Sequence, residues 1–299
     1  SSGHYQVIVA QRSDLDLTNQ HDVITFFKQH QFDEVYIAAA KVGGIFANNS
    51  YPADFIFQNI MIQTNIIHAA HLSNINKLLF LGSSCIYPVH ATQPIQESSL
   101  LIGPLEITNQ AYAIAKISGI EMCHSYNKQY SRDYRCMMPT NLYGPNDNFH
   151  NENSHVIPGL ISKFYKAVHT NQSEIIVWGT GTPLREFLHV EDLANACIFM
   201  MQLPKEAFFN ALDTTMPHIN IGSGEEISIA ELVMMLIEIS GFTGNIIYDP
   251  SKPDGSPRKL LDSSAMGELG WSPKKILKLG LTDTYNWFAS NQHLISTKD

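Results

Sequence analysis

The sequence has 299 residues, of which 44% are hydrophobic and 16% are charged. These values are typical of a soluble globular protein that buries a large core in one domain or in two coupled domains. The net charge of −9 argues against nucleic acid as the main partner, although a locally basic pocket for an anionic small molecule is compatible with it.

Membrane and secretory signals are not found in the sequence. No stretch of about twenty apolar residues occurs, and the first residues do not read as a signal peptide. The four cysteines show no C-x-x-C pairing and no dense framework, which is typical of a reducing compartment. We therefore expect a cytoplasmic protein that has no membrane partner.

Strand and helix patterns alternate through the first half of the chain. Short apolar or β-branched runs predict strands at 5–10, 34–40, 78–82 and 134–138, and helical patterns fall at 22–30, 54–72 and 112–130. Alternation at this spacing indicates βαβ units, so we expect an α/β fold with a doubly wound parallel sheet. The apolar residues of 54–72 surround much of the helix, which predicts burial on two sides, within the chain or against a second subunit.

The pattern loosens after residue 139. A turn-rich stretch is followed by a predicted helix at 156–169, a strand at 175–178 and a Gly/Pro turn at 179–183. The last third predicts a helix at 229–239 and a Pro/Gly/Lys loop at 250–260.

Tyr112 and Lys116 are the most informative pair in the sequence. Residues four apart lie on one face of a helix, and a nearby ammonium is expected to lower the pKa of the phenol and make it a usable acid/base. Ser83, Ser84 and Cys85 follow a predicted buried strand, and ligands of open α/β sheets collect at the carboxyl ends of such strands. The serine hydroxyls are therefore placed to meet the tyrosine and a substrate oxygen.

Six runs of sequence carry a family resemblance. They are Ala38-Ala-Ala-Lys-Val-Gly-Gly-Ile45, Leu81-Gly-Ser-Ser-Cys-Ile-Tyr-Pro88, Met138-Pro-Thr-Asn-Leu-Tyr-Gly-Pro-Asn-Asp-Asn-Phe-His150, Asn153-Ser-His-Val-Ile-Pro158, Arg185-Glu-Phe-Leu-His-Val-Glu-Asp192 and Lys252-Pro-Asp-Gly-Ser-Pro-Arg-Lys259. Together they resemble the extended short-chain dehydrogenase/reductases and, within them, the GDP-L-fucose synthases. The similarity covers nearly the whole chain.

One feature departs from this family. Its members begin with a strand, a glycine-rich turn and a helix, whose backbone N–H groups hold the cofactor pyrophosphate. No G-x-x-G-x-x-G motif occurs here, and Ser1-Ser2-Gly3 is similar to the loop before the family's second strand. We expect that roughly two dozen residues of the family pattern lie outside this sequence, because a sheet without its central strand would expose a long unpaired edge. A genuine truncation would put dinucleotide binding in doubt.

The resemblance implies two coupled domains. Residues 1–142 and about 186–220 would form the dinucleotide-binding domain, which is Rossmann-like and lacks the first strand and glycine loop in this chain. Residues from about 143 to 185 and from 221 to 299 would form a smaller substrate-binding domain. The site is expected between the two.

The implied reaction begins with inversion at C3 and C5 of GDP-4-keto-6-deoxy-D-mannose. The 4-ketone acidifies both neighbouring C–H bonds, so one base and one acid on opposite sides of the ring suffice. Cys85 is the candidate base and His155 the candidate acid. A small buried hydrophobe is the alternative for Cys85, and a capping or structural residue is the alternative for His155.

The second implied stage is reduction of the ketone with NADPH to give GDP-L-fucose. Tyr112 would donate a proton to the C4 oxygen, while Lys116 would tune Tyr112 and hold the nicotinamide ribose. Ser83, or Ser84 in its place, would polarise the keto oxygen and would stabilise an enolate during the first stage.

Further residues are expected to hold the cofactor NADP(H). Arg12 follows the first predicted strand, where an arginine accommodates a 2′-phosphate; a solvated surface arginine is the alternative. Ala39 lies at the end of the next strand, where a small side chain lets a cofactor approach the backbone. Asn141 is expected near the substrate or the cofactor ribose, and His155 near the cofactor.

The GDP-sugar is expected to contact a second group of residues. Arg185 and Lys259 are the candidate diphosphate partners, because a guanidinium or an ammonium in a loop suits phosphate. Lys163 stands where the family tends to have an arginine. The lysine keeps the positive charge but cannot make the two parallel hydrogen bonds of a guanidinium. Trp178 would cover the guanine or fill core. Ser84 and Asn141 complete the predicted substrate-binding set.

Other functions remain open at this stage. A related GDP-sugar enzyme, for example a heptose epimerase or reductase, would need some of the same catalytic residues. A non-catalytic nucleotide-binding scaffold is a different class of answer, which only the missing glycine loop favours. The apolar helices at 54–72 and 112–130 suggest a homodimer, with two-sided burial inside a monomer as the alternative.

Overall fold

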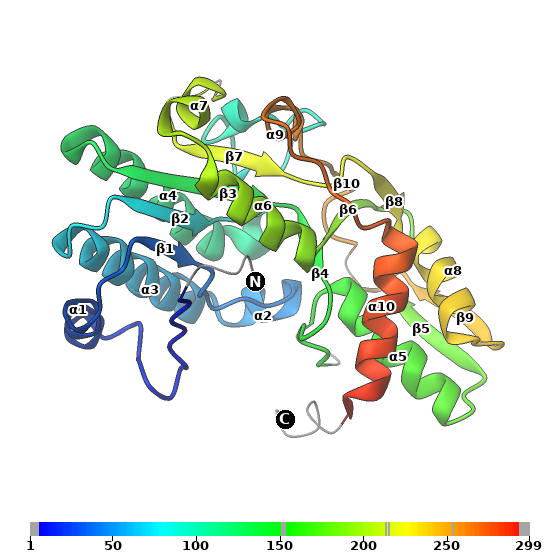
Figure 1. Ribbon diagram of the computed structural model, residues 1–299. Helices are drawn as coiled ribbons and strands as arrows, with labels where there is room; N and C mark the ends of the chain where they lie inside the picture. The colour runs from blue at the N-terminus through cyan, green and yellow to red at the C-terminus, as the bar shows by residue number, and fades with distance from the viewer. Residues whose placement is uncertain (1–5, 151–153, 213, 215, 253, 293–299) are drawn as a thin grey trace.

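The computed structural model describes residues 6–150, 154–212, 214, 216–252 and 254–292, and Figure 1 shows two connected parts. The larger part is built on a four-stranded parallel sheet with the order β1-β2-β3-β7. Its strands are β1 (Glu34–Ile37), β2 (Lys77–Leu81), β3 (Asp133–Pro139) and β7 (His218–Ile221). Every residue of β3 is buried, as expected for a central strand covered on both faces.

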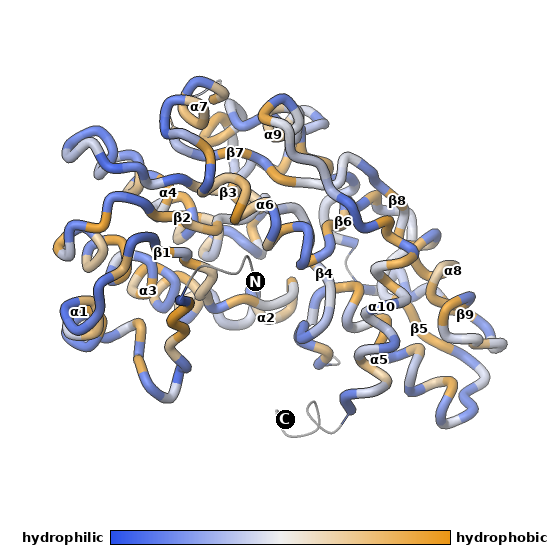
Figure 2. Tube along the Cα trace, in the orientation of Figure 1, coloured by the Kyte–Doolittle hydropathy of each residue, from blue (hydrophilic) through white to orange (hydrophobic). Residues whose placement is uncertain are grey.

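Helices cover both faces of this sheet, which confirms the doubly wound α/β fold (Figure 1). On one face pack α1 (Gln20–Gln29), α3 (Pro52–Leu72) and α4 (Gln110–Tyr130). On the other face pack α6 (Val190–Gln202), α7 (Lys205–Asn210) and α9 (Ser264–Glu268). The hydrophobic colouring of β2 in Figure 2 reflects this burial between two helical layers.

The smaller part surrounds a separate hydrophobic core. Its strands are β4 (Asn141–Tyr143), β6 (Leu184–His189) and β10 (Arg258–Lys259), in the parallel order β10-β6-β4, with β8 (Glu226–Ser228) antiparallel to β6. β5 (Glu174–Trp178) pairs with β9 (Asn245–Asp249). Three helices supply the rest of this core: α5 (Val156–His169), α8 (Ile229–Ser240) and α10 (Leu277–Ser290).

Short elements connect these layers. α2 (Ile45–Ser50) follows β1, and three 3₁₀ turns lie between β2 and α4. They are η1 (Ser84–Ile86), η2 (Glu97–Ser99) and η3 (Ile107–Asn109).

The predicted strand at 5–10 is wrong for residues 6–10, and residue 5 lies outside the described residues. Residues 6–10 belong to no strand, and Val7 and Val9 are 78% and 72% exposed. A strand needs a neighbour for its N–H and C=O groups, and within the described residues β1 pairs only with β2. The β-branched side chains of 5–10 alone cannot supply that neighbour.

Arg135 ties α6 to the centre of the sheet. Its side chain is 0% exposed and makes two hydrogen bonds of 2.7 Å to the carboxylate of Asp133, two residues earlier on β3. It also donates to the carbonyl oxygens of Met200 and Leu203 at the end of α6. A buried guanidinium is tolerated only with such partners, so this network fixes the helix against the strand.

Asp133→Ala is expected to lower the free energy of unfolding by about 3–5 kcal/mol, because it leaves the Arg135 guanidinium buried without its counter-ion. Urea denaturation followed by circular dichroism measures the loss. Glu238→Ala is the matched control: it breaks an exposed pair with Lys278 and should cost a small fraction of that amount. Equal losses in the two variants would contradict the assigned importance of the buried pair.

Candidate active site

The carboxyl ends of the parallel strands bring the predicted site residues to one edge of the sheet. Ala39 follows β1, Ser83 follows β2, and Asn141 follows β3 after a single intervening residue. Parallel neighbours end on the same side, so side chains far apart in sequence meet there.

Tyr112 and Lys116 lie one turn apart on α4 and point the same way, as the spacing predicts. Nζ of Lys116 lies 5.7 Å from the centroid of the Tyr112 ring and donates a 2.8 Å hydrogen bond to the carbonyl oxygen of Leu81. Leu81 is the last residue of β2, so the ammonium is fastened to the strand that leads into Ser83. Because Lys116 is only 3% exposed, this hydrogen bond compensates for the interactions with water that the ammonium group loses on burial.

The predicted lowering of the Tyr112 pKa is wrong. Burial raises the pKa of this phenol, and the neighbouring Cys85 raises it further. Burial also lowers the pKa of Lys116 to about 8, against smaller upward effects of Cys85 and Cys136. Desolvation disfavours the charged form of each group and is the largest influence on both pKa values. The phenol therefore keeps its proton and is suited to donate it.

The turn η1 sets the position of Cys85. Oγ of Ser83 caps this turn by accepting a 3.4 Å hydrogen bond from the backbone N–H of Cys85. Burial raises the pKa of the Cys85 thiol, opposed first by the charge of Lys259 and then by a hydrogen bond to Ser83 and the charge of Lys116. The two positive charges act in the predicted direction, but burial outweighs them. Cys85 therefore rests as a thiol.

Lys259 links Cys85 electrostatically to His155. It lies on β10 in register with Arg185 of β6, and burial lowers its pKa while Cys85 raises it. His155 stands at the N-cap of α5 without a side-chain capping bond, so the capping role left open by the sequence is not found. The imidazole is exposed at the surface of the site, yet the surrounding protein desolvates it enough to lower its pKa, and Lys259 lowers the pKa further.

Arg185 is bound to the loop that follows β9. Its guanidinium donates to the carbonyl oxygens of Leu184 at 2.8 Å and Asp254 at 3.1 Å. The Asp254 carboxylate accepts in turn from the backbone N–H of Thr180 at 2.7 Å and from its hydroxyl at 2.9 Å. Gly179, at φ 81°, has no room for a side chain, because a Cβ there would collide with Oδ1 of Asp254. These hydrogen bonds hold the loop after β9 against the end of β5.

Two ammonium groups flank the ring of Trp178 at that strand end. Nζ of Lys163 lies 5.2 Å and Nζ of Lys252 lies 5.4 Å from a ring of the indole, which is 43% exposed. Lys163 also donates to the carbonyl oxygen of Ile176 at 3.0 Å. The core-filling alternative for Trp178 does not fit this exposure, and the cations beside an exposed ring suit an anionic, aromatic ligand.

The remaining predicted residues differ in how firmly the structure ties them to this cluster. Nδ2 of Asn141 donates to the carbonyl oxygen of Glu186 at 2.9 Å, which places Asn141 beside Arg185 on β6. Ser84 is buried next to Cys85. Ala39 follows β1 in a loop that Asn59 holds through both the N–H and the C=O of Lys41. Arg12 lies on an exposed turn. The structure records no contact of Arg12 or Ala39 with the cluster among its described residues.

Sequence reasoning missed several residues that shape the site. Asp254 and Lys252 lie in the Lys-Pro-Asp-Gly turn that carried the resemblance, and the turn alone did not reveal their partners. Glu186 stands next to Arg185, and only the structure shows that its side chain is fully buried. A carboxylate inside a β-strand beside a predicted phosphate ligand is the signal that could have singled out Glu186.

With this geometry established, comparison with known proteins identifies the family. The NAD dependent epimerase/dehydratase family matches residues 1–222. The chain belongs to this family. It is 54% identical over 290 residues to a GDP-L-fucose synthase of Escherichia coli K12, an alignment that covers 97% of this chain and 90% of that protein. The resemblance predicted from the sequence is confirmed.

Solved structures agree with the fold and the family. A GDP-6-OMe-4-keto-L-xylo-heptose reductase from C. jejuni superimposes with a TM-score of 0.89 at 34% identity, covering 96% of this chain and 91% of that one. A GDP-L-fucose synthetase from Naegleria fowleri bound to NADP has a TM-score of 0.84 at 27% identity, covering 96% and 86%. Within the described residues, no helix has the length and apolar character needed to cross a bilayer.

Alkylation of Cys85 by iodoacetamide is expected to be slower at pH 7 than that of a small free thiol, and its rate should still be rising above pH 9. The thiolate is the reactive form, and burial raises the pKa of this thiol. Mass spectrometry of the peptide that contains Cys85 measures the rate, and Cys85→Ser gives the background. Rapid labelling at pH 7 that levels off below pH 8 would contradict the burial effect.

Proposed function

We propose that this protein is an NADPH-dependent GDP-L-fucose synthase, which inverts C3 and C5 of GDP-4-keto-6-deoxy-D-mannose and then reduces the C4 ketone. The observation that carries the proposal is the grouping of Cys85, Tyr112 and Lys116 at the end of β2. The chain that holds them is 54% identical to the E. coli enzyme over nearly its whole length.

Cys85 and His155 carry out the inversions in this proposal. The base takes the proton from the carbon beside the ketone, which gives an enolate, and the acid returns a proton to the opposite face. The pKa directions of the two groups favour a thiol and a neutral imidazole at rest. A thiolate with an imidazolium holds the same total number of protons as a thiol with a neutral imidazole. Transfer of one proton from Cys85 to His155 therefore prepares the base and the acid together.

Ser83, Tyr112 and Lys116 act on the C4 oxygen. Ser83 donates a hydrogen bond that polarises the ketone, with Ser84 as its neighbour in the buried turn. NADPH, when bound, supplies the hydride to C4. Tyr112 donates its phenolic proton to the resulting C4 oxygen, and the positive charge of Lys116 supports the phenolate that remains.

The carboxyl edge of the sheet fits the nicotinamide half of this cofactor. Small side chains follow β1 at Ala39, and Lys116 presents a buried ammonium at the end of β2 where it can hold the ribose. Asn141 and His155 complete the proposed set, and Arg12 would hold the 2′-phosphate that distinguishes NADP(H).

The nucleotide diphosphate of the substrate binds in the second part of the molecule. Arg185 and Lys259 lie side by side on neighbouring strands and supply the positive charge. Lys163 adds a third cation, and Trp178 offers an exposed ring to the guanine. Ser84 and Asn141 line the sugar side of this proposed site.

The two separate cores support the proposed division into domains. Residues 1–142 and about 186–220 form the dinucleotide-binding domain, and about 143–185 and 221–299 form the substrate-binding domain. Met266 and Trp271 pack with the core of the first part, so the chain returns to that part before α10. Among the described residues all four cysteines are free thiols, which supports the proposal that the protein acts in the cytoplasm.

A reductase of GDP-heptose derivatives is the second candidate. The C. jejuni heptose reductase, with its TM-score of 0.89, favours it. Incubation with GDP-4-keto-6-deoxymannose and NADPH, followed by NADPH absorbance and identification of the sugar, tests the proposal. GDP-L-fucose supports it, while the absence of turnover with NADPH fluorescence showing no binding would favour a nucleotide-binding scaffold.

Cys85→Ser is expected to slow inversion by about 100-fold or more, because it removes the proposed base, and to leave ketone reduction nearly unchanged. Tyr112→Phe should slow reduction far more than inversion, because reduction needs the phenolic proton and inversion loses only one hydrogen bond to the enolate oxygen. Deuterium incorporation from D₂O at C3 and C5 measures inversion, and NADPH oxidation with the already inverted keto sugar measures reduction. Cys197→Ser, at another buried thiol, is the control. If both variants lost both stages equally, the separation of roles would be wrong.

We infer that the protein forms a homodimer through α3 and α4. These helices pack on each other, and both still expose apolar side chains: Phe57 is 61% and Leu72 is 55% exposed on α3, and Ile114 is 40% exposed on α4. A second copy of the same face would cover them.

Phe57→Glu is expected to convert the dimer to a monomer, because it places a charge on the apolar face of α3. Sedimentation equilibrium measures the mass of the wild type and the variant. Met234→Glu, at an exposed apolar position on α8, is the matched control and should leave the mass unchanged. A wild-type protein that sediments as a monomer would contradict the inference.

A further inference from the structure

Glu186 holds together several backbone segments that border the site. Its carboxylate accepts hydrogen bonds from the backbone N–H of Gly224 at 2.8 Å and of Leu261 at 3.2 Å, although the residue is 0% exposed. Its main-chain carbonyl oxygen accepts from the side chains of Thr140 at 3.2 Å and Asn141 at 2.9 Å. One residue of β6 thus contacts the end of β3, the loop after β7 and the chain that follows β10.

These bonds contribute to the position of Lys259. Leu261 is two residues beyond Lys259, and Lys259 pairs in parallel register with Arg185, the neighbour of Glu186. Gln93 accepts from the backbone N–H of Leu260 at 2.8 Å and fixes the intervening residue. The proposed diphosphate ligands Arg185 and Lys259 are therefore held in one frame, to which Glu186 contributes from inside the protein.

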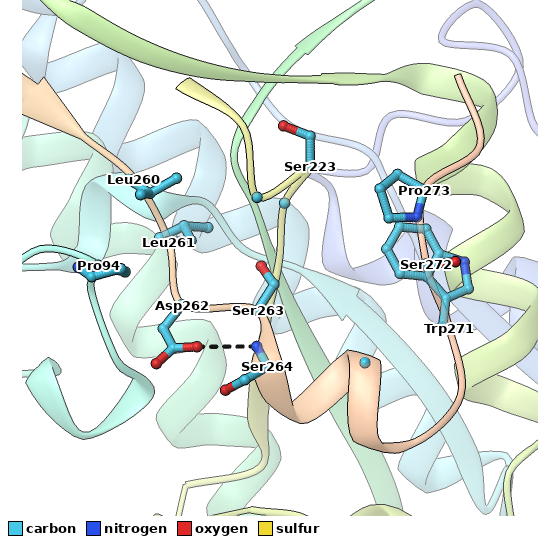
Figure 3. Close-up of a pocket in the computed structure, with 13 residues that line it drawn as sticks. Pro94, Ser223, Leu260, Leu261, Asp262, Ser263, Ser264, Trp271, Ser272 and Pro273 are labelled. Carbon is cyan, nitrogen blue, oxygen red and sulfur yellow. Dashed lines mark hydrogen bonds between the residues drawn. The ribbon is translucent and has the colours of Figure 1, made fainter. Parts of the chain in front are cut away.

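Core packing of Leu261, backbone hydrogen bonds to Ile95 and a bond from Asn220 to Asp262 also hold the segment after β10. Residues 222–224 and 260–264 line one pocket of about 320 Å³, shown in Figure 3, where Ser223, Leu260 and Leu261 are labelled around the open space. Gly222 approaches the carboxylate so closely that a Cβ there would collide with Oε1 of Glu186. Beside these contacts, the Glu186 carboxylate joins the two segments to β6 through charge-assisted hydrogen bonds.

We propose that Glu186 is a positioning residue for the nucleotide diphosphate: its buried carboxylate fastens the segment that carries Lys259 beside Arg185. The inference rests on the proposed function for the identity of the ligand. It assigns to Glu186 no contact with the substrate or the reacting atoms.

Glu186→Gln tests this proposal with two separate affinities. The variant keeps the shape of the side chain but sets an amide NH₂ against a backbone N–H, so one of the two fastened segments is released. We expect the Kd for GDP, measured by titration calorimetry, to rise about 10-fold or more, since a hydrogen bond to a charged group is lost. The Kd for NADPH, measured by fluorescence, should stay within about twofold because the main-chain carbonyl that holds Thr140 and Asn141 is unchanged.

Two further variants make the result specific. Gly222→Ala keeps the carboxylate and displaces it by steric contact, so it should weaken GDP binding in the same way; if Glu186→Gln does not fold, this variant decides the question. Glu238→Gln is the control, because Glu238 lies on α8 in an exposed ion pair with Lys278 of α10, and its loss leaves the bonds of β6 and β10 intact. Its GDP affinity should equal that of the wild type.

Three results would overturn the assignment: unchanged GDP affinity in both site variants, a parallel loss of NADPH affinity, or an equal loss in Glu238→Gln. Failure of the proposed function would be visible separately, as a wild-type protein that binds GDP and does not convert the keto sugar. The KM for the keto sugar should follow the Kd for GDP in an active enzyme, with kcat less affected.

Discussion

Desolvation at the carboxyl edge of the sheet sets the protonation state of the groups on which the chemistry depends. Desolvation by the surrounding protein is the largest influence on the pKa of Cys85, Tyr112, Lys116, His155 and Lys259, and in each case it favours the neutral form. Neighbouring groups oppose this effect at Cys85 and Lys116 and add to it at Tyr112 and His155, and Lys259 acts on both Cys85 and His155. A site of this kind keeps protons on its acids and gives each positive charge a large influence on its neighbours.

The fold creates this environment by joining two parts through short strands. β4 and β6 pair in a separate small sheet and contribute side chains to the cores of both parts, so Asn141 and Arg185 lie on the connection itself. The segment of β10 returns along β6 and places Lys259 opposite the end of β2. Groups of the cofactor side and the nucleotide side are thereby fixed to the same frame, and a displacement of one strand would alter both.

The sequence predicted the parts of this structure that local patterns determine. Apolar periodicity located α3, α4 and α5 within two residues, and the i,i+4 spacing placed Tyr112 and Lys116 on one face. The prediction failed where strand formation depends on a neighbouring strand. Residues 6–10 have β-branched side chains but pair with no strand, while the short strands β4 and β6 form because they pair with each other. The sign of the Tyr112 pKa shift failed for a similar reason, because spacing reveals a nearby charge and does not reveal the depth of burial. Glu186 was missed because its role depends on backbone N–H groups from distant segments.

The upward shift of the Tyr112 pKa suits an enzyme that performs two reactions at one carbonyl group. During inversion the C4 oxygen carries the charge of an enolate, and a phenol of high pKa stabilises it through a hydrogen bond while keeping its proton. After hydride transfer the same oxygen becomes an alkoxide, which is a much stronger base than an enolate and takes the proton. A phenol with a lowered pKa would protonate the enolate oxygen more readily and compete with reprotonation at carbon. The burial that overturned the expectation from sequence therefore suits both stages of the proposed mechanism. Their order follows from the ketone, because its reduction removes the group that acidifies the hydrogens at C3 and C5.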